Sequence, residues 1–425
     1  MQYRIELTQT ILPFWMGAAL DRSNGGIFTC LDREGRIYGT DKSVWFQGRA
    51  LWTFSKAYNV IEKRPEYLEA ARLIYDFLPK CTGPDGRMAF TVTQEGGELQ
   101  KRRYYFSETF AAIGCAEYYK ATGDAEALRR AEMYFDVAYR CYTGEIPLQP
   151  KFNPENYALK ALSPVMILLS TAQTMAVSGS ARADEYRRIA EDCLHEILHG
   201  GYLTERALLE HVHPQQGFVD SPTGRIVNPG HSMEAAWFVM SQGLLSGNRE
   251  TLEAGRKIID LTLPLGMDEK HGGFIAFTDV LGKPPVQLEW DMKLWWPQCE
   301  AMIALRLAGS LFADERYDRL YHTLADYCER CFIDRECGEW YGYLRRDGLP
   351  TMPPTKGSTF KGPFHVPRSL MIADRLLTQL QSQGFELVTV EELFWRRGIT
   401  PQAGKLYFSA QNTGVNRCAK ALYFD

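Results

Sequence analysis

The chain has 425 residues, of which 45% are hydrophobic and 24% are charged, so it can bury a large core as a globular protein. Its net charge of −4 and the lack of a basic stripe argue against nucleic acid as a partner. Charges near the N-terminus, ten scattered cysteines and no apolar run of roughly 18 residues predict a cytoplasmic protein without a signal peptide or a membrane span.

Helical periodicity dominates the chain, because apolar residues recur at spacings of three and four in twelve stretches. Short polar connections between these stretches predict antiparallel neighbours. Many stretches are apolar around much of their circumference, which is typical of helices packed on two sides. The predicted helices are 3–19, 43–62, 65–79, 104–122, 124–141, 155–178, 182–199, 231–246, 249–264, 290–309, 312–332 and 364–381.

Short segments rich in Gly and Asp separate the helices and form a weak repeat. Asp21–Phe28 resembles Asp268–Phe274 and, more loosely, Asp334–Trp340, and each segment is followed by a turn. We interpret these segments as small β-hairpins. A helix–hairpin–helix period of roughly 50–60 residues indicates a repeat architecture.

Twelve helices in antiparallel pairs form either an open superhelix or a closed α/α barrel. The glycine and aromatic residues of the hairpins favour closure, with the hairpins building a pocket at one mouth. No linker divides residues 1–382, which we predict to be one domain. Residues 383–425 show no clear period and form a predicted C-terminal extension of unknown role.

Two patterns typical of metal sites are interpreted as structural. His195–His199 fits H-E-x-x-H, but Gly200 and Gly201 end the helix at once and no third ligand follows. Cys328 and Cys331 form one CxxC pair with no second pair to complete a tetrahedral site. We therefore predict no metal.

Two histidines lie where a loop meets a predicted helix. His231 follows Asn-Pro-Gly and has Glu234 three residues on, which is one helical turn away and able to orient an imidazole. His365 has Arg368 at the same spacing, where a guanidinium can hold an oxygen-rich ligand. Spacing alone leaves catalytic and structural roles equally open for both histidines.

Other charged residues lie among apolar or aromatic ones. Arg49 and Glu300 each lie in an aromatic-rich helix, where a lone charge is costly to bury unless it is paired. A shared sugar-binding pocket and a buried salt-bridge network are both compatible with them. Glu210 precedes His211-Val212-His213 in a hairpin-like stretch, where alternation places Glu210 and the two histidines on opposite faces. That stretch either meets substrate or is solvated.

These segments carry a resemblance to the N-acylglucosamine 2-epimerases, also described as renin-binding proteins. They run in the order of that family over residues 10–380. The matching segments are Pro13–Trp15, Gly25–Gly26 with Leu31–Gly35, Trp45–Arg49, Asn228–His231, Lys293–Pro297 and Lys361–Arg368.

The resemblance implies an all-α (α/α)6 barrel of six helix pairs that interconverts N-acetylglucosamine and N-acetylmannosamine as a cytoplasmic homodimer. It implies no cofactor for the chemistry and ATP as an activator, although no Walker-type phosphate loop is present. The implied catalytic residues are His231, His365 and Glu234, and the implied substrate-binding residues are Arg49, Glu210, Glu300, Arg368 and Trp295.

The expected mechanism removes the proton on carbon 2 of the open-chain sugar with one histidine and returns a proton to the opposite face with the other. Glu234 is expected to orient His231, and Arg49 or Arg368 to stabilise charge on oxygen. One alternative is a 2-epimerase or aldose–ketose isomerase of a non-acylated sugar such as mannose or cellobiose. A second is a protein-binding scaffold without enzymatic activity.

Overall fold

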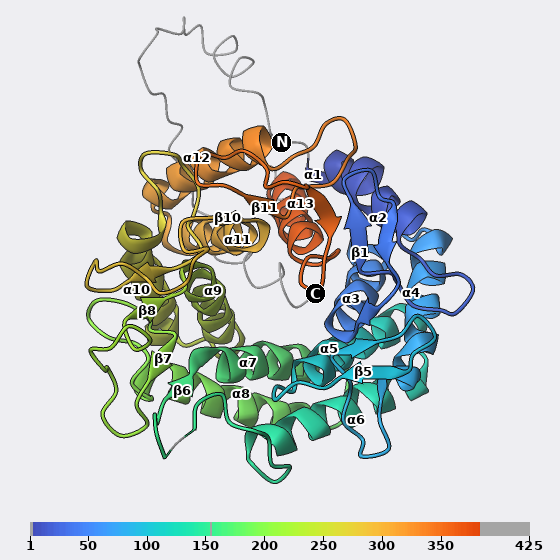
Figure 1. The fold of residues 1–425 in the computed structure, drawn as a ribbon, viewed down its shortest axis with the longest axis horizontal. Coiled ribbons are helices and arrows are strands. Elements are labelled where there is room, and N and C mark those ends of the chain that lie inside the picture. Colours follow the sequence, from blue (N-terminus) through green and yellow to red (C-terminus); the bar gives the residue numbers. More distant parts are fainter. Residues whose placement is uncertain (1–2, 154, 383–425) are drawn as a thin grey trace, which may run out of the picture.

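The computed structural model describes residues 3–153 and 155–382. Within these residues the helices alternate between an outer and an inner ring (Figure 1). The outer segments are α1–η1–α2 (Tyr3–Ile5, Glu6–Ile11, Leu12–Ala18), α4 (Pro65–Phe77), α6 (Ala125–Tyr142), α8 (Ala183–His199), α10 (Arg249–Gly266) and α12 (Glu315–Cys331). The inner helices are α3 (Val44–Val60), α5 (Phe106–Thr122), α7 (Leu162–Ala176), α9 (Pro229–Ser246), α11 (Trp295–Phe312) and α13 (His365–Ser382).

The inner ring is closed, because each inner helix packs against the next one and α13 packs against α3 (Figure 1). The predicted (α/α)6 barrel is therefore confirmed, and its six pairs include the described residues from 3 to 382 with residue 154 excepted. The predicted extension at 383–425 lies outside the described residues. Among the described residues, no helix combines the length and apolarity needed to cross a membrane.

Burial separates the two rings as the sequence pattern predicts. The outer helix α12 buries Tyr317, Tyr321, Leu324 and Cys328, one stripe at spacings of three and four. The inner helix α9 is buried on nearly every side from Pro229 to Gly243. Inner helices therefore contact both their outer partners and their ring neighbours, which requires apolar or small residues around the helix.

The contact between α3 and α5 depends on two glycines. A Cβ on Gly48 would lie 2.4 Å from the carbonyl carbon of Phe110, and a Cβ on Gly114 would lie 2.7 Å from the carbonyl oxygen of Gly48. Both distances are shorter than atoms tolerate, so any larger residue would push the helices apart. The close approach also holds Arg49, the next residue of α3, against Phe110.

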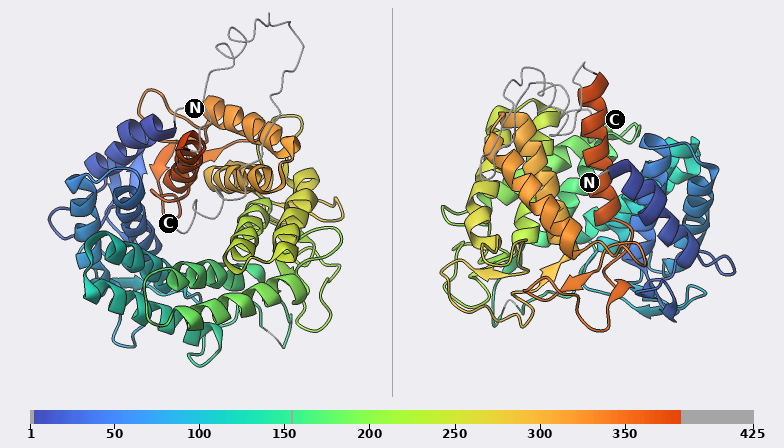
Figure 2. Two further views of the ribbon diagram at one scale, coloured as in Figure 1. Left: turned by 180° about the vertical axis from the view of Figure 1, so that it is seen from behind. Right: turned by 90° about the horizontal axis from the view of Figure 1, so that it is seen from above.

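Short strands gather at one end of the barrel, where the inner helices begin (Figure 2, right). The strand before an inner helix pairs antiparallel with a strand from a following repeat, and the pairing of β12 with β1 joins the last repeat to the first. The strands are β1 (Cys30–Asp32), β2 (Ile37–Gly39), β3 (Lys42–Ser43), β4 (Thr91–Val92), β5 (Glu98–Gln100), β6 (Lys160–Ala161), β7 (His211–Val212), β8 (Ile226–Val227), β9 (Thr278–Asp279), β10 (Lys293–Leu294), β11 (Tyr343–Leu344) and β12 (Thr355–Gly357).

The three Asp-Gly segments are tighter than the predicted hairpins. Each is a loop closed by one bridge, Leu20 to Ile27 in the first copy. The aspartate of each copy accepts backbone N–H groups of its own loop and pairs with a fully buried lysine. The pairs are Asp21–Lys42 (2.8 Å), Asp268–Lys293 (2.9 Å) and Asp334–Lys356 (3.1 Å). The sequence repeat is thus a repeated buried ion pair that fastens each loop to the strand before an inner helix.

Most helix boundaries agree with the prediction to within about two residues, but two inner helices begin later than predicted. α7 begins at Leu162 rather than 155, and α11 begins at Trp295 rather than 290. In both places β-pairing occupies the preceding residues, since Lys160 pairs with Val212 and Lys293 pairs with Leu344. These pairings join distant parts of the chain, which local periodicity does not report.

Candidate active site

A cavity of about 480 Å³ opens at the strand-bearing mouth. Since the inner helices begin at this mouth, side chains in their first two turns face the cavity. Six of the eight predicted site residues line it, and the other two, Glu300 and Arg368, lie behind its wall. The six are Arg49, Glu210, His231, Glu234, Trp295 and His365.

The first histidine pair joins His231 to Glu210. Asn228 caps α9 by accepting the backbone N–H of His231 at 3.2 Å, which fixes the position of the ring at the helix start. Nδ1 of His231 lies 2.8 Å from Oε2 of Glu210. Burial alone would lower the pKa of His231, but the Glu210 carboxylate outweighs burial and raises it above its ordinary value. The same contact lowers the pKa of Glu210, although burial alone would raise it.

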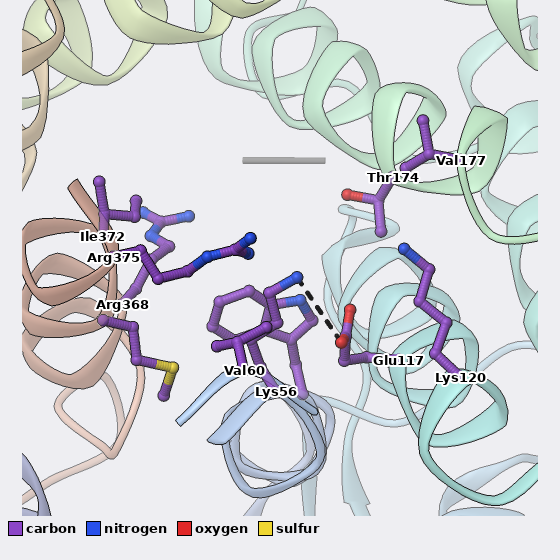
Figure 3. Close-up of a pocket in the computed structure, with 11 residues that line it drawn as sticks. Lys56, Val60, Glu117, Lys120, Thr174, Val177, Arg368, Ile372 and Arg375 are labelled. Atoms are coloured by element: carbon purple, nitrogen blue, oxygen red, sulfur yellow. Dashed lines mark ion pairs between the residues drawn. The ribbon is translucent and has the colours of Figure 1, made fainter. Parts of the chain in front are cut away.

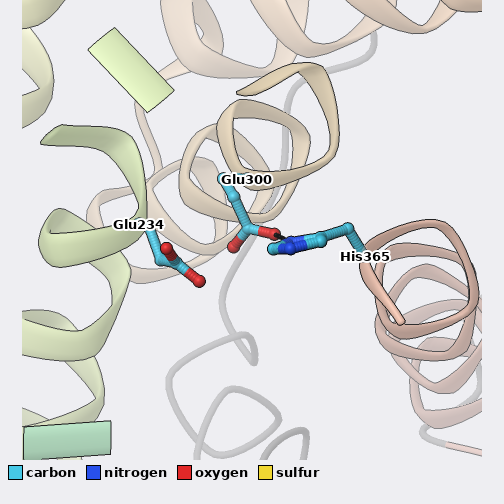
Figure 4. Close-up of side chains that lie close together, drawn as sticks. All are labelled: Glu234, Glu300 and His365. Atoms are coloured by element: carbon cyan, nitrogen blue, oxygen red, sulfur yellow. Dashed lines mark hydrogen bonds and ion pairs between the residues drawn. The ribbon is translucent and has the colours of Figure 1, made fainter. Parts of the chain in front are cut away.

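The second histidine pair joins His365, the first residue of α13, to Glu300 of α11. Nδ1 of His365 lies 2.7 Å from Oε1 of Glu300 (Figure 4). Burial, followed by the charges of Arg49 and Arg368, lowers the pKa of His365 well below its ordinary value. The two histidines therefore have similar carboxylate partners and opposite protonation preferences.

Arg368 links the carboxylates behind the cavity. Its Nη2 donates to Oε1 of Glu234 at 2.9 Å and to Oε1 of Glu300 at 2.7 Å. Nε1 of Trp237 donates to the other oxygen of Glu300 at 2.8 Å. The expected orientation of His231 by Glu234 is therefore wrong in its detail, because Glu210 holds that ring while Glu234 bonds to Arg368. The helical spacing of Glu234 suggested the contact, and a carboxylate from the β7 segment supplies it instead.

Glu234, Glu300 and His365 bring three potential metal-ligand atoms within 4.8 Å of one another (Figure 4). This donor set does not fit a metal ion as it stands, because the guanidinium of Arg368 already bridges the two carboxylates. A divalent cation there would have to displace that buried side chain and leave its charge unpaired, which is costly.

Trp296 of α11 contacts both catalytic candidates. Its ring centroid lies 5.1 Å from that of His231 and 6.0 Å from that of His365. The histidines come from α9 and α13, which pack on either side of α11. Trp295, the predicted residue, is buried and packs edge-on to His365 at 6.2 Å. Trp296 was present in the matching segment Lys293–Pro297, but helical phase alone did not distinguish it from its neighbour.

Arg49 reaches the cavity from the second turn of α3. Its guanidinium lies 4.0 Å from the ring centroid of Phe110 and 5.2 Å from that of Phe364. Among the described residues, its Nε is buried without a hydrogen-bond partner. Burial lowers the pKa of Arg49 to about 10, so it is still charged at neutral pH. A buried cation with an unused donor at a cavity wall is suited to binding a ligand oxygen.

Sequence reasoning assigned no site role to several further polar residues that line the cavity, among them Lys151, His211 and Gln287. His211 was placed on the face opposite Glu210, because strict alternation was assumed through a stretch whose strand contains only His211 and Val212. Lys151 and Gln287 belong to loops without a periodic pattern. No spacing signal could have placed either of them in the cavity.

The patterns interpreted as structural lie away from the cavity. His195 and His199 are exposed at the end of the outer helix α8, and Nζ of Lys160 lies 2.5 Å from Oε1 of Glu196. Cys328 is buried, and Cys331 is partly buried, at the end of α12. None of the four residues lines the cavity.

Solved structures with the same fold act on carbohydrates. The cellobiose 2-epimerase of Spirochaeta thermophila DSM 6192 superposes with a TM-score of 0.74 at 24% identity, covering 87% of this chain and 94% of that one. A D-mannose isomerase superposes with a TM-score of 0.76 at 18% identity, covering 87% and 96%. The relatives in sequence place the chain among the carbohydrate 2-epimerases, a class of isomerase.

Sequence comparison then specifies the family. The model of the N-acylglucosamine 2-epimerase (GlcNAc 2-epimerase) family matches residues 26–361. The N-acylglucosamine 2-epimerase of Rattus norvegicus is 34% identical over 381 residues, covering 87% of this chain and 90% of its own length. The Homo sapiens enzyme is 35% identical over 386 residues, covering 88% and 89%. The chain belongs to the N-acylglucosamine 2-epimerase family.

Proposed function

We propose that this protein interconverts N-acetyl-D-glucosamine and N-acetyl-D-mannosamine by moving a proton at carbon 2. The observation that carries the proposal is the pair of carboxylate-bound histidines that both contact Trp296. Because Nδ1 of each ring is held by a carboxylate, Nε2 is the nitrogen left to exchange a proton with a ligand. The relatives named N-acylglucosamine 2-epimerase support this choice of substrate.

The reaction needs one base and one acid on opposite faces of carbon 2. Once the sugar ring has opened, the carbonyl at carbon 1 acidifies the neighbouring C–H bond. One imidazole takes that proton, and the C–H electron pair moves into an enolate. The enolate then takes a proton from the second imidazole on the other face, which inverts carbon 2. No electron is gained or lost overall, so no redox partner is required.

The protonation preferences assign the resting roles. His365 has a lowered pKa and is neutral at rest, so it is the base. His231 has a raised pKa and holds a proton more readily than His365, so it is assigned as the acid. After one turnover the two protonation states are exchanged, and the reverse reaction starts from that exchanged state. One singly protonated pair therefore serves both directions.

Charged groups around the pair have supporting roles in the proposal. Arg49, with its unused Nε, stabilises negative charge on the carbonyl oxygen as the enolate forms. Arg368 and Glu234 keep Glu300 in place and thereby fix His365. Trp296 offers an aromatic face to the apolar side of the sugar chain. Direct contact of substrate with Glu300 or Arg368 stays a prediction.

The test is exchange and product formation in heavy water, followed by proton NMR. N-acetylmannosamine is expected to lose its carbon-2 hydrogen to solvent while N-acetylglucosamine appears. Turnover of mannose or cellobiose in place of the acylated sugars would favour the non-acylated alternative. Absence of exchange with every sugar would overturn the enzymatic proposal and leave the scaffold alternative.

Three other properties are proposed from the family resemblance: a cytoplasmic location, a homodimer and activation by ATP. A small basic cavity lies at the opposite end of the barrel, near the ends of α3, α5 and α7 (Figure 3). Lys56, Lys120 and Arg375 line it, and Lys56 lies 3.7 Å from Glu117. Its volume of about 30 Å³ holds one or two water molecules, so a nucleotide does not fit there as it stands.

A further inference from the structure

A second polar pair lies in the active-site cavity. The loop 143–153 follows α6 and carries Lys151 to the cavity wall. Nζ of Lys151 lies 2.5 Å from Nε2 of His211, the first residue of β7. The ring of Phe152 packs edge-on to His211 at 5.2 Å between centroids. Two contacts from one loop thus hold the imidazole of His211.

The contact with Lys151 fixes the protonation of His211. An ammonium group has only donors, so Nε2 of His211 must accept and the proton of the neutral ring lies on Nδ1. Burial and then the charge of Lys151 lower the pKa of His211 to about 4, against the opposing effect of Glu210. His211 is therefore neutral at physiological pH and does not serve as a third acid or base.

The same pair places a positive charge close to the first catalytic histidine. His211 directly follows Glu210, whose carboxylate holds His231 at 2.8 Å. Lys151 attracts Glu210, lowering the pKa of that carboxyl, and it opposes protonation of His231. Glu210 thus has two cationic neighbours, which are the imidazolium of His231 when that ring is protonated and the ammonium group of Lys151.

We propose that Lys151 is a positioning residue for His231, acting through His211 and Glu210. It holds Glu210 against the catalytic ring and limits how strongly that carboxylate favours the imidazolium. The inference rests on the proposed function for its kinetic consequence, but the effect on His231 itself is independent of substrate. Nothing in this role requires Lys151 to touch the reacting carbon.

Other titratable and charged groups lie around His231, and their side chains stay in place when Lys151 is replaced. These groups lie on the elements around the His231 ring. One substitution at Lys151 removes the ammonium group without altering a catalytic contact. Glu210 near β7 and Glu234 on α9 act on His231 directly, and His211 and His365 are coupled to it when charged. Glu300 on α11, Arg368 on α13 and Arg49 on α3 carry the charges beside these groups.

The experiment compares Lys151→Met with Lys151→Arg. The matched control is Lys160→Met, which removes a nearby ammonium that pairs with Glu196 at 2.5 Å instead of with the cavity. Histidine ring resonances of the ligand-free protein are titrated by NMR, with His231→Asn identifying the signal of His231. The pH dependence of kcat/KM is then measured from both epimers.

Lys151→Met is expected to raise the titration midpoint of His231 by about one pH unit, the effect of removing one nearby like charge. The alkaline limb of the kcat/KM profile is expected to move to higher pH by the same amount with either epimer as substrate. The two shifts are equal because the ratio of the forward and reverse kcat/KM values equals the equilibrium constant at every pH. Lys151→Arg is expected to restore the wild-type titration midpoint of His231 and the wild-type alkaline limb. Lys160→Met is expected to leave both unchanged.

An unshifted His231 titration in folded Lys151→Met would overturn the inference, as would an equal shift in Lys160→Met. Folding is checked by circular dichroism for each variant. If the wild-type protein fails to epimerise any sugar, the proposed function fails. The NMR titration still decides the role of Lys151 in that case.

Discussion

The two histidine pairs of the cavity are chemically alike but differ in their surroundings. His231 keeps 24% of its side chain exposed, whereas His365 keeps 7%. Each ring presents Nδ1 to a glutamate at nearly the same distance, 2.8 Å and 2.7 Å. Nevertheless the pKa of His231 is raised and that of His365 is lowered. A carboxylate partner alone therefore does not decide the protonation of a histidine.

The difference arises from how each glutamate is shared. Glu300 also accepts hydrogen bonds from Arg368 and Trp237, so much of its negative charge is already compensated. Arg49 and Arg368 then oppose a further positive charge on His365. Within the described part of the chain, the side chain of Glu210 forms a hydrogen bond with His231 alone, and its attraction for a proton on that ring exceeds the cost of burial. Burial of His365, reinforced by the neighbouring arginines, thus makes the second pair a base.

Removing either ring should have the largest effect. His231→Ala and His365→Ala are each expected to reduce epimerisation by about 10² to 10⁴-fold while leaving the protein folded, because each deletes one proton-transfer step. In heavy water, a variant that retains the base for one epimer should still exchange its carbon-2 hydrogen while forming little product. The other variant should do so for the other epimer, as measured by proton NMR.

Identical exchange patterns in the two variants would contradict the assignment of the histidines to opposite faces. A single-base mechanism predicts that one variant loses exchange with both epimers. The other variant would then be impaired equally in each direction. The epimerase proposal itself would survive that result.

Arg49 offers a way to change one pair and spare the other. Arg49→Met is expected to lower kcat/KM by about 10² to 10³-fold, the usual effect of losing a donor to a developing oxyanion. It should also raise the pKa of His365, since a positive charge is removed beside it. Because His365 must be neutral to act as base, the acidic limb of the kcat/KM profile should move to higher pH.

Arg49→Lys is the matched variant, because it keeps the charge and loses the planar fork. Its activity should fall while its acidic limb stays in place. A shift of the acidic limb in both variants, or in neither, would show that the charge of Arg49 does not set the protonation of His365.

Much of this comparison could be foreseen and part of it could not. Periodicity predicted twelve helices in antiparallel pairs and placed His231 and His365 at helix starts, because local spacing encodes which side of a helix is buried. The partners of those rings come from other elements: Glu210 lies 21 residues before His231, and Glu300 lies 65 residues before His365. Such contacts depend on ring closure, so Glu234 was matched to the wrong group.

Loop residues were harder still to predict. Lys151 reaches the cavity from a segment with no hydrophobic period, and its role depends on the fold of β7 around His211. The family resemblance supplied Arg49 and Arg368 as charged site residues, but not that Arg368 lies behind the cavity wall. Distinguishing a substrate contact from a supporting one required the positions of the helices.

Neutralising Glu210 or Glu300 should lower kcat/KM by less than the substitutions above, and should affect the two histidine pairs differently. Glu210→Gln and Glu300→Gln are each expected to cost about 10 to 100-fold in kcat/KM, as losses of residues that orient a functional ring usually do. Glu210→Gln should lower the pKa of His231, so the alkaline limb moves to lower pH. Glu300→Gln should leave that limb in place but lower the melting temperature more, because buried Arg368 loses part of its charge compensation.

Both substitutions keep the size of the side chain, so each serves as the steric control for the other. Thermal unfolding and the pH profile of kcat/KM give two independent measurements for each variant. Equal melting temperatures, or a shift of the same limb in both variants, would mean that the two pairs are equivalent after all.

The smallest effect is expected from His195 and His199 on the outer ring of the barrel. His195 and His199 are exposed on α8, and their ring centroids lie 4.7 Å apart. Glu196, the glutamate of the H-E-x-x-H pattern, lies between them in the sequence and pairs with Lys160. Its carboxylate is therefore bound to a cationic side chain instead of being directed at a metal ion shared with the histidines. His195→Ala and His199→Ala should therefore leave kcat/KM within about twofold of the wild-type value, since surface substitutions change little. Dialysis against a chelator should also leave turnover unchanged. The opposite result would be loss of turnover on dialysis, recovery when zinc is added, and no such recovery in the variant that lacks both histidines. That result would make the outer pair part of the mechanism, so the cavity histidines would no longer be its sole proton carriers.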